Sequence, residues 1–400
     1  MRKPRLGIVQ ARPTQFDGPL FRWLTQSGNL QLKVYFTASD DKPIAVDPEL
    51  GIAPGWNENI TSGYVFVFRS KGIRGSLSFL REILDGKHDL VIVAGYTKWV
   101  IVLAAICLRI WGRSVGMRSD SVLLGRDLDG MKEKLKRRIL RLGFPWLFRT
   151  GHPTGTLARA YLTHYGFKDS SLFLFPYNVD SDYLYRQSLC FGEIEKLRKR
   201  YDIAANAFIV LGVLKFIPRE DPMTLVRGFL RMAERHPKAI LLLVGDGELR
   251  GAIEALIHES GSRGITLAGY VPYAELGYYF GLASVFVHPA LGESWGVSVN
   301  EALACGCPTI AADTVGAAVD LVVPGVTGFC FRAGNPEALA QRLQVIIEDE
   351  SLLGAMRENA RAKSLQWTYQ QTETYLLSAA AYVGNDDRGG TKLDRQRSRS

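Results

Sequence analysis

Two glutamates with seven residues between them stand out in residues 287–308, VHPALGESWGVSVNEALACGCP. Glu293 lies in a loop after an apolar run, and Glu301 lies in a helix-like run that Gly306 is placed to end. The start of such a helix offers backbone N–H groups to a diphosphate, and a carboxylate can accept two hydrogen bonds from a ribose diol. The pair can equally be one ordinary loop glutamate and one capping glutamate, and the spacing alone leaves both interpretations open.

Two shorter patterns also have the residue types of a ligand site. Gly245 and Gly247 follow an apolar run, but Arg250 stands where a dinucleotide-binding fingerprint needs its third glycine, so that fingerprint fails. The two glycines then suit a phosphate site or a plain turn. Asp127 and Asp129 offer two carboxylates to a divalent metal, but no third oxygen ligand is evident beside them. The sequence therefore predicts no metal and no cofactor.

Apolar runs and helix-like runs alternate along the chain, in two sets of which the second starts near residue 206. This alternation predicts parallel sheets with helices on both faces, and ligands belong at the carboxyl ends of their strands. In the first set we expect strands at 5–10, 30–36, 88–96 and 114–120, and helices at 19–25 and 97–111. In the second set we expect strands at 207–216, 239–247, 265–271, 283–290 and 307–313, and helices at 223–237, 300–306 and 336–349.

The length of 400 residues is too great for one ordinary core and predicts two domains. We expect the first domain over 1–185 and the second over 186–365, with a polar linker at 180–205. A last helix over 366–383 is expected to return to the first domain. The tail, 384–400, is poor in apolar residues and is predicted to be disordered.

The net charge and the cysteine content limit the kinds of partner and the cellular compartment that we expect for the protein. Lys and Arg number 49 against 40 Asp and Glu, and the formal net charge of +9 favours phosphorylated ligands, lipid headgroups or nucleic acid. Five cysteines are few and odd in number, which indicates a reducing compartment. The apolar run at the N-terminus is too short for a signal peptide, and the run at 99–111 is too short to span a bilayer. We therefore expect a cytoplasmic protein.

Residues 207–370 resemble the second domain of the family-4 retaining glycosyltransferases, which have the two-domain GT-B fold. The resemblance rests on the glutamate pair, on DTVGAAVDLVVPGVTGF after it, and on LLLVGDGELR and LAGYV before it. These motifs occur in the family's order and span the domain. The resemblance implies an α/β protein of GT-B fold, with two Rossmann-like doubly wound domains facing across a cleft.

The resemblance assigns these residues to a nucleotide-sugar donor. By this likeness Glu301 binds the ribose, Glu293 binds hydroxyls of the transferred sugar, and the backbone near Tyr270 and Val271 meets the base. The remaining predicted donor residues lie at the helix start and in the glycine turn: Ser294, Trp295, Gly296, Val297, Gly245 and Gly247.

Members of the family place two basic residues near the diphosphate, the second of them a lysine five or six positions after the first. In GVLKFIPREDP (212–222) Lys215 fits the first position, but Glu220 stands at the second, with Arg219 beside it. Two like charges about 4 Å apart cost roughly 4 kcal/mol at an effective dielectric of 20. We therefore expect Glu220 to turn away from the phosphates and to pair with a nearby base, while Lys215 or Arg219 faces them.

The amino-terminal half resembles a less common branch of the family, through residues 13–24, 47–56, 94–96, 117–121 and 175–184. In the family this domain normally recognises the acceptor. Arg118 and Asp120 fall at a strand end where the family often places a His-Asp pair. They join Glu293, Lys215 and Arg219 as candidate catalytic residues, and the alternative for them is a structural ion pair.

The segment KEKLKRRILRLGFPWLF (132–148) is basic and has Leu135, Ile139 and Leu142 at helical spacing. This stripe either packs a solvated helix onto its domain or forms a patch for an anionic membrane or a lipid-linked acceptor. The second interpretation implies a peripheral position at the inner face of the membrane. Aromatic residues are not interleaved with the basic ones, so we expect no nucleic-acid partner.

The predicted function is transfer of a sugar from a nucleotide-diphosphate sugar to a glycan or lipid-linked acceptor, with retention of configuration and without a metal. A nucleotide-sugar epimerase or a phosphorylase on the same fold is one alternative. A non-catalytic nucleotide-sugar-binding partner of another transferase is the other, because Glu220 replaces the usual lysine.

Overall fold

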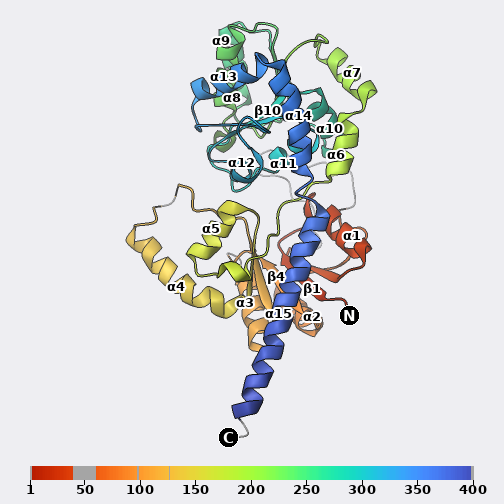
Figure 1. Ribbon diagram of the computed structural model, residues 1–400, viewed down its shortest axis with the longest axis vertical. Coiled ribbons are helices and arrows are strands. Elements are labelled where there is room, and N and C mark those ends of the chain that lie inside the picture. Colours follow the sequence, from red (N-terminus) through yellow and green to blue (C-terminus); the bar gives the residue numbers. More distant parts are fainter. Residues whose placement is uncertain (1, 39–59, 97–98, 126, 398–400) are drawn as a thin grey trace. The chain divides into compact units, whose positions relative to one another are not determined.

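The computed structural model describes residues 2–38, 60–96, 99–125 and 127–397, with side chains up to residue 385 (Figure 1). The chain forms two compact units. Of the described residues, unit 1 contains those up to 177 together with 369–397, and unit 2 contains 178–368. The boundary predicted at 185 falls inside a helix of unit 2, α6 (Ser181–Ser188).

Unit 1 is built on a parallel sheet whose described strands have the order β3-β2-β1-β4-β5-β6. The strands are β1 (Arg5–Gln10), β2 (Gln31–Phe36), β3 (Val65–Phe68), β4 (Leu90–Ala94), β5 (Val115–Ser119) and β6 (Thr150–Pro153). The helices are α1 (Asp17–Ser27), α2 (Gly72–Asp85), α3 (Trp99–Ile110), α4 (Met131–Leu147), α5 (Thr156–His164), the 3-10 turn η1 (Asp169–Ser171) and α15 (Tyr369–Arg397).

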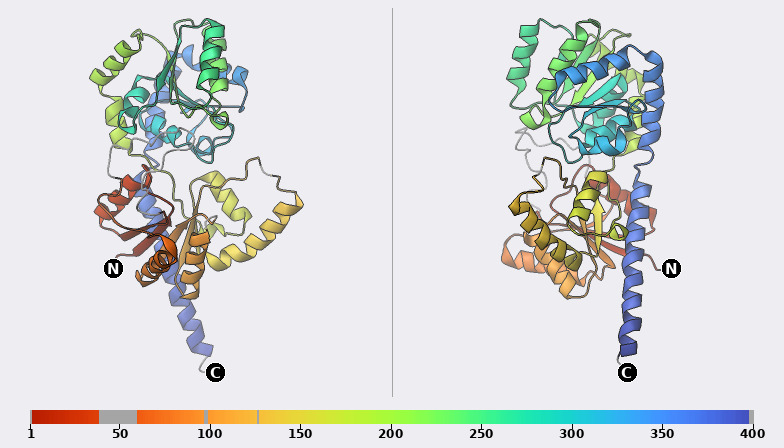
Figure 2. Two further views of the ribbon diagram at one scale, coloured as in Figure 1. Left: turned by 180° about the vertical axis from the view of Figure 1, so that it is seen from behind. Right: turned by 60° about the vertical axis from the view of Figure 1, so that its left-hand side comes forward.

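Each face of the unit 1 sheet has its own hydrophobic core, because successive strand residues point to opposite faces. Leu6 and Ile8 of β1 belong to the core that α1 and α15 cover. Val91 and Val93 of β4 belong to the core that α2, α3, α4 and α5 cover. Figure 2 shows α15 on one side of the sheet and α3 and α4 on the other. Both faces are therefore buried, as the apolar strand sequences require.

Helix α15 belongs to unit 1 although it follows unit 2 in the chain. Leu376, Ala379 and Val383 are buried in the core beside α1, and Glu373 accepts a hydrogen bond of 3.0 Å from the side-chain amide of Asn29. The helix continues to Arg397, through residues for which a disordered tail is predicted. No proline interrupts the sequence between its two ends.

Unit 2 is built on a second parallel sheet, whose described strands have the order β12-β11-β10-β7-β8-β9. The strands are β7 (Ile209–Val213), β8 (Ile240–Val244), β9 (Ile265–Gly269), β10 (Val285–His288), β11 (Thr309–Ala312) and β12 (Gly328–Phe331). The helices are α6, α7 (Phe191–Arg200), α8 (Pro222–Ala233), α9 (Arg250–Ser260), α10 (Tyr273–Leu282), α11 (Val297–Ala304), α12 (Gly316–Leu321), α13 (Pro336–Ile347) and α14 (Glu350–Ser364), with the 3-10 turn η2 (Pro218–Glu220). The predicted α/β class with two parallel sheets is confirmed.

The prediction of a linker over 180–205 is wrong, because this segment forms α6 and α7. Helix α6 packs against α10 at very close range: a Cβ on Gly277 would lie 2.5 Å from the side chain of Gln187. The backbone N–H of Gly277 donates to the Gln187 side-chain oxygen at 3.2 Å. The contact is made through glycine and a buried polar side chain, so it leaves no apolar period in the sequence.

Candidate functional site

The carboxyl ends of β10, β7, β8 and β9 lie at one edge of the unit 2 sheet, because these strands are parallel and adjacent. The segments that follow them contain all the donor residues predicted in loops: 214–220, 245–247, 270–271 and 289–297. Tyr270 is partly exposed there and Val271 is buried. This edge is where open parallel α/β sheets bind their ligands.

Gly245 and Gly247 hold the loop that carries Lys215. The N–H of Leu214 donates to the carbonyl of Val244 at 3.0 Å, so the loops after β7 and β8 lie side by side. The φ angles of the glycines are +137° and +154°, and a Cβ on Gly245 would lie 1.8 Å from the Leu214 carbonyl oxygen. Only glycine permits this approach. The two glycines therefore support Lys215 at the ligand edge.

Arg219 links the two acidic residues of the site. Its guanidinium contacts Glu220 at 2.8 Å through Nη2 and contacts Glu293 through Nη1. The backbone adds a second link, since the N–H of Leu291 donates to the carbonyl of Arg219 at 2.9 Å. Glu220 is buried, whereas the Arg219 side chain is 43% exposed. The predicted pairing of Glu220 with a nearby base is confirmed, and the base is its own neighbour.

His288 lies with these two glutamates and was not singled out in the sequence. One ligand atom from each of Glu220, His288 and Glu293 lies within 4.8 Å of the others, so the three could hold a metal ion. Burial, and then the charge of Arg219, lowers the pKa of His288 to about 4, so the imidazole is neutral. Arg219 contacts both carboxylates, so a metal ion bound there would compete with its guanidinium for them.

Helix α11 begins at this edge without a side-chain cap among the described residues. Its N-cap residue, Gly296, has φ +95°, and a Cβ there would lie 2.9 Å from Val315. The N–H of Val299 donates to the carbonyl of Gly296 at 3.1 Å, and the N–H groups before it, of Val297 and Ser298, precede the first carbonyl that an α-helical bond could reach. Trp295 is buried and its indole N–H donates to the Asn300 side chain at 2.7 Å. The Trp295 side chain thus anchors the loop, and this segment presents backbone to a ligand.

Glu301 lies within α11 and is 4% exposed. Burial raises the pKa of its carboxyl group to about 7. Gly306 adopts the left-handed conformation, φ +68°, just after the end of the helix, as the sequence predicts. A carboxylate this deeply buried is costly unless a ligand supplies hydrogen bonds. The helix therefore holds an acceptor of hydrogen bonds ready at the ligand edge.

In unit 1, Arg118 and Asp120 lie at the end of β5 in separate polar contacts. Arg118 is buried, its Nη1 donates to Asp17 at 2.8 Å, and its guanidinium carbon lies 4.1 Å from the ring centroid of Phe175. Asp120 accepts a hydrogen bond of 3.0 Å from the hydroxyl of Tyr177. Among the described residues, the second terminal nitrogen of Arg118 is buried without a partner. The Asp17 contact makes Arg118 part of a structural ion pair.

The comparison with known families concerns the stretch of unit 2 that holds this edge. Residues 193–363 match the family described as glycosyl transferases group 1. The match covers less than half of the chain and lies within unit 2. This matched stretch, called the group 1 domain below, contains Lys215, Arg219, Glu293 and Glu301, whereas Arg118 and Asp120 lie outside it.

Curated relatives are similar to the chain over little more than half its length. An alpha-monoglucosyldiacylglycerol synthase of Acholeplasma laidlawii is 25% identical over 232 residues, 57% of this chain and 56% of the relative. A GDP-mannose-dependent alpha-(1-6)-phosphatidylinositol monomannoside mannosyltransferase of Mycobacterium tuberculosis is 27% identical over 227 residues, 54% of this chain and 57% of the relative. The chain thus matches little more than half the length of either relative.

Solved structures extend the likeness to the whole fold. A glycosyltransferase from Rickettsia africae ESF-5 aligns with a TM-score of 0.74 at 15% identity, covering 96% of this chain and 99% of the other. Anabaena Alr3699/HepE in complex with UDP and glucose aligns with a TM-score of 0.70 at 17% identity, covering 95% and 100%. The fold of the chain is GT-B, with a Rossmann-like sheet in the group 1 domain and another in unit 1.

Outside the group 1 domain, α4 exposes the apolar stripe for which two interpretations were open. Leu135, Ile139 and Leu142, called the α4 stripe below, are 61%, 58% and 75% exposed. The interpretation that they pack the helix is therefore wrong, and α4 contacts the core through Phe144, with Leu140 and Leu147 beside it. No helix in the described part of the chain is long and apolar enough to cross a membrane.

Asp127 has a structural role at the start of α4. One of its carboxylate oxygens accepts hydrogen bonds from the backbone N–H groups of Asp129 and Gly130, at 3.1 and 3.0 Å. Within the residues that the structure describes, the group that could hold a metal does not include Asp127 or Asp129.

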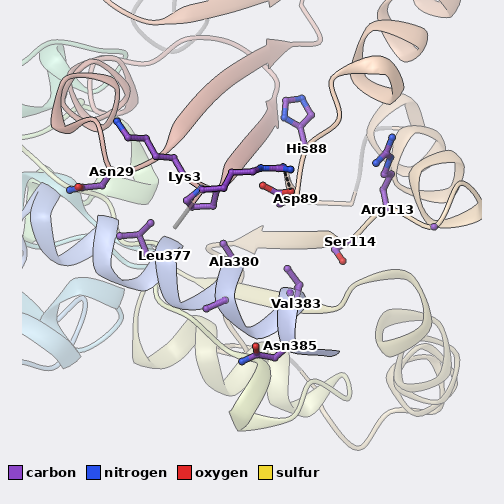
Figure 3. Close-up of a pocket in the computed structure, with 15 residues that line it drawn as sticks. Lys3, Asn29, His88, Asp89, Arg113, Ser114, Leu377, Ala380, Val383 and Asn385 are labelled. Atoms are coloured by element: carbon purple, nitrogen blue, oxygen red, sulfur yellow. Dashed lines mark hydrogen bonds and ion pairs between the residues drawn. The ribbon is translucent and has the colours of Figure 1, made fainter. Parts of the chain in front are cut away.

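A cavity of about 890 Å³ lies at the opposite, amino-terminal edge of the unit 1 sheet (Figure 3). His88 and Ser114, just before β4 and β5, line it together with Leu377 and Val383 of α15. Asp89 there pairs with Arg2 at 2.8 Å. The cavity lies away from the strand ends that bear the candidate residues.

Proposed function

We propose that the protein is a retaining glycosyltransferase that moves a sugar from a nucleotide-diphosphate sugar to a glycan or lipid-linked acceptor. The observation that carries this proposal is the buried Glu301 in a helix without a side-chain cap, at the edge that also bears Lys215 and Arg219. The ribose diol donates two hydrogen bonds to Glu301, and the diphosphate accepts from the first N–H groups of α11.

The proposed chemistry is front-face displacement. The bond between the anomeric carbon and the phosphate oxygen breaks, and the acceptor oxygen bonds to that carbon from the same face. The departing phosphate oxygen takes the proton of the acceptor hydroxyl. Negative charge builds on the diphosphate as its bond to the anomeric carbon breaks, and Lys215, Arg219 and the start of α11 stabilise this charge. Glu293 accepts hydrogen bonds from the hydroxyls of the transferred sugar, and no metal takes part.

Two kinds of relative support the substrate classes. The solved structure with UDP and glucose supports a nucleotide-sugar donor. The curated relatives carry the names of lipid glycosides, which supports a lipid-linked acceptor. The α4 stripe, set among the basic residues of α4, supports attachment of the protein to an anionic membrane surface.

A donor screen tests the proposal. Wild type and Glu301→Gln are melted with UDP-, GDP- and ADP-sugars, because a ligand at a hundredfold of its Kd stabilises the folded state by about 2.7 kcal/mol. We expect one base to raise the Tm of the wild type and to have little effect on the variant. Product analysis by NMR then gives the anomeric configuration. No shift with any nucleotide sugar, or an inverted product, contradicts the proposal.

A further inference from the structure

An apolar groove lies between α2 and α3 on the surface of unit 1. Its volume is about 360 Å³, and its lining comes from the amino-terminal parts of the two helices. Leu80, Phe79 and Ala104 lie towards the core, and Phe79 and Ala104 are buried in it. The walls are formed by large apolar side chains that remain exposed, namely Ile73, Leu77, Trp99 and Leu103.

The exposure of these walls is unusual for a surface without a ligand. Ile73 is 81% exposed and Trp99 is 69% exposed, although both stand beside a hydrophobic core. Contiguous exposed apolar surface of this kind marks a binding site, and ligand pockets of this volume are lined mainly by apolar and aromatic side chains.

The groove opens at the ligand edge of the unit 1 sheet. Arg69, the first residue after β3, lines it, and α2 starts three residues later at Gly72. Trp99 opens α3, which follows β4. Both helices therefore present their first turns at the carboxyl ends of parallel strands, where such sheets take their substrates.

One cationic side chain, that of Arg69, lines the groove beside the start of α2. Arg69 donates to the carbonyl of Thr37 at 2.8 Å and to the hydroxyl of Ser76 at 3.0 Å, and both partners are neutral. An apolar groove lined by a cationic side chain fits an acyl chain joined to an anionic or phosphorylated headgroup.

We propose that the groove between α2 and α3 binds the acyl chain of a lipid acceptor, with the headgroup at Arg69. This inference rests on the proposed function and narrows its acceptor to lipids with an acyl chain. Each buried methylene strengthens binding about fourfold, so affinity rises with chain length until the groove is filled. The site is separate from the α4 stripe, which meets the membrane surface and holds no single chain.

A fluorescence experiment tests the groove without requiring activity. Lysophosphatidylglycerols with chains from butanoyl to dodecanoyl, brominated near the chain end, are titrated below micelle formation, and tryptophan quenching is followed. We expect the quenching to saturate, and the affinity for the probe to rise about fourfold with each added methylene. Trp99→Phe removes it, whereas Trp146→Phe, which changes another exposed tryptophan of unit 1, keeps it. Quenching that survives Trp99→Phe overturns the proposal.

A second pair of variants separates the groove from the membrane surface. Leu77→Ser with Leu103→Ser changes two exposed walls, and we expect at least a tenfold loss of affinity for the dodecanoyl probe. Ile139→Ser in the α4 stripe is the matched control and keeps that affinity. An equal loss of affinity in the double variant and in Ile139→Ser overturns the proposal. The proposal is also overturned if the wild type self-associates and the Leu77→Ser, Leu103→Ser variant does not, because the groove is then an interface between two copies.

The donor screen distinguishes failure of the inference from failure of the proposed function. If a nucleotide sugar stabilises the protein but no probe quenches Trp99, the groove assignment is wrong and the transferase proposal stands. If the probes quench Trp99 but no nucleotide sugar binds, the lipid site stands as a binding site and its role as acceptor site falls.

Discussion

Replacing Glu301 by glutamine should make the protein more stable without donor and weaker towards donor. The carboxyl group is 4% exposed, and burial raises its pKa from 4.5 to about 7. The folded state therefore binds more protons than the unfolded state between these values, so stability falls as pH rises through this window. A shift of this size corresponds to about 3 kcal/mol lost above about pH 7. The neutral amide of Glu301→Gln does not carry this cost.

The assay is thermal and urea unfolding of both proteins from about pH 4.5 to about pH 8, without ligand. We expect nearly equal stability at the acid end and a variant more stable by up to about 3 kcal/mol at the alkaline end. Glu337→Gln, which changes an exposed glutamate of α13, should show no such divergence. Calorimetry with the donor found in the screen should give binding weaker by roughly ten- to a hundredfold, because hydrogen bonds to a charged group contribute about 1.5–3 kcal/mol.

Two results would refute this reasoning. Stability curves that run parallel across the whole pH range would mean that Glu301 is not a buried carboxylate in solution. Unchanged donor affinity in a folded variant would remove Glu301 from the donor site. The same pKa also predicts that donor binding in the wild type strengthens as pH rises through about 7, since the ribose needs the ionised carboxylate.

Three further predictions concern a metal ion, the basic residues near the diphosphate and the membrane. Turnover should survive EDTA, because Arg219 already contacts both carboxylates that could hold a metal; loss of activity that Mn²⁺ restores would contradict this. Lys215→Ala and Arg219→Ala should each lower kcat about tenfold or more, whereas Glu220→Gln should lower kcat less. A rise in kcat in Glu220→Lys would instead favour a site that only binds the nucleotide sugar. Serine at all three positions of the α4 stripe should reduce flotation with anionic vesicles at low salt, and unchanged flotation would make the stripe ordinary surface.

The buried central strands could be predicted from the sequence. The predicted strand at residues 5–10 matches β1. The strands β4, β7 and β8 also lie within predicted strands, because strands buried on both faces have continuously apolar sequences. Three of the edge strands were missed: β3, β6 and β12 have four residues each, and β6 reads TGHP, which contains no apolar run. The edge strand β9 was predicted within 265–271. A strand of four residues shows little of the apolar pattern by which strands are recognised.

The candidate site was only partly predictable, because its polar contacts join distant parts of the chain. Glu301 and the start of α11 follow from a local motif. The contact of Arg219 with Glu293 joins residues 74 positions apart, and that of Arg118 with Asp17 joins residues 101 positions apart. Neither contact has a local sequence pattern. His288 could have been noticed as a polar residue ending an apolar strand, but its carboxylate neighbours could not.

The place of α15 in unit 1 sets an order for folding during synthesis. The residues of α15 complete a core whose members outside this helix lie within the first 175 residues, so that face of the sheet lacks part of its cover until α15 has been synthesised. The described part of unit 2, 178–368, is continuous and can form its sheet earlier. Domains generally fold as units while the ribosome is still working. Unit 1, whose synthesis starts first, is therefore completed after unit 2, and in the meantime one face of its sheet lacks the cover that α15 provides.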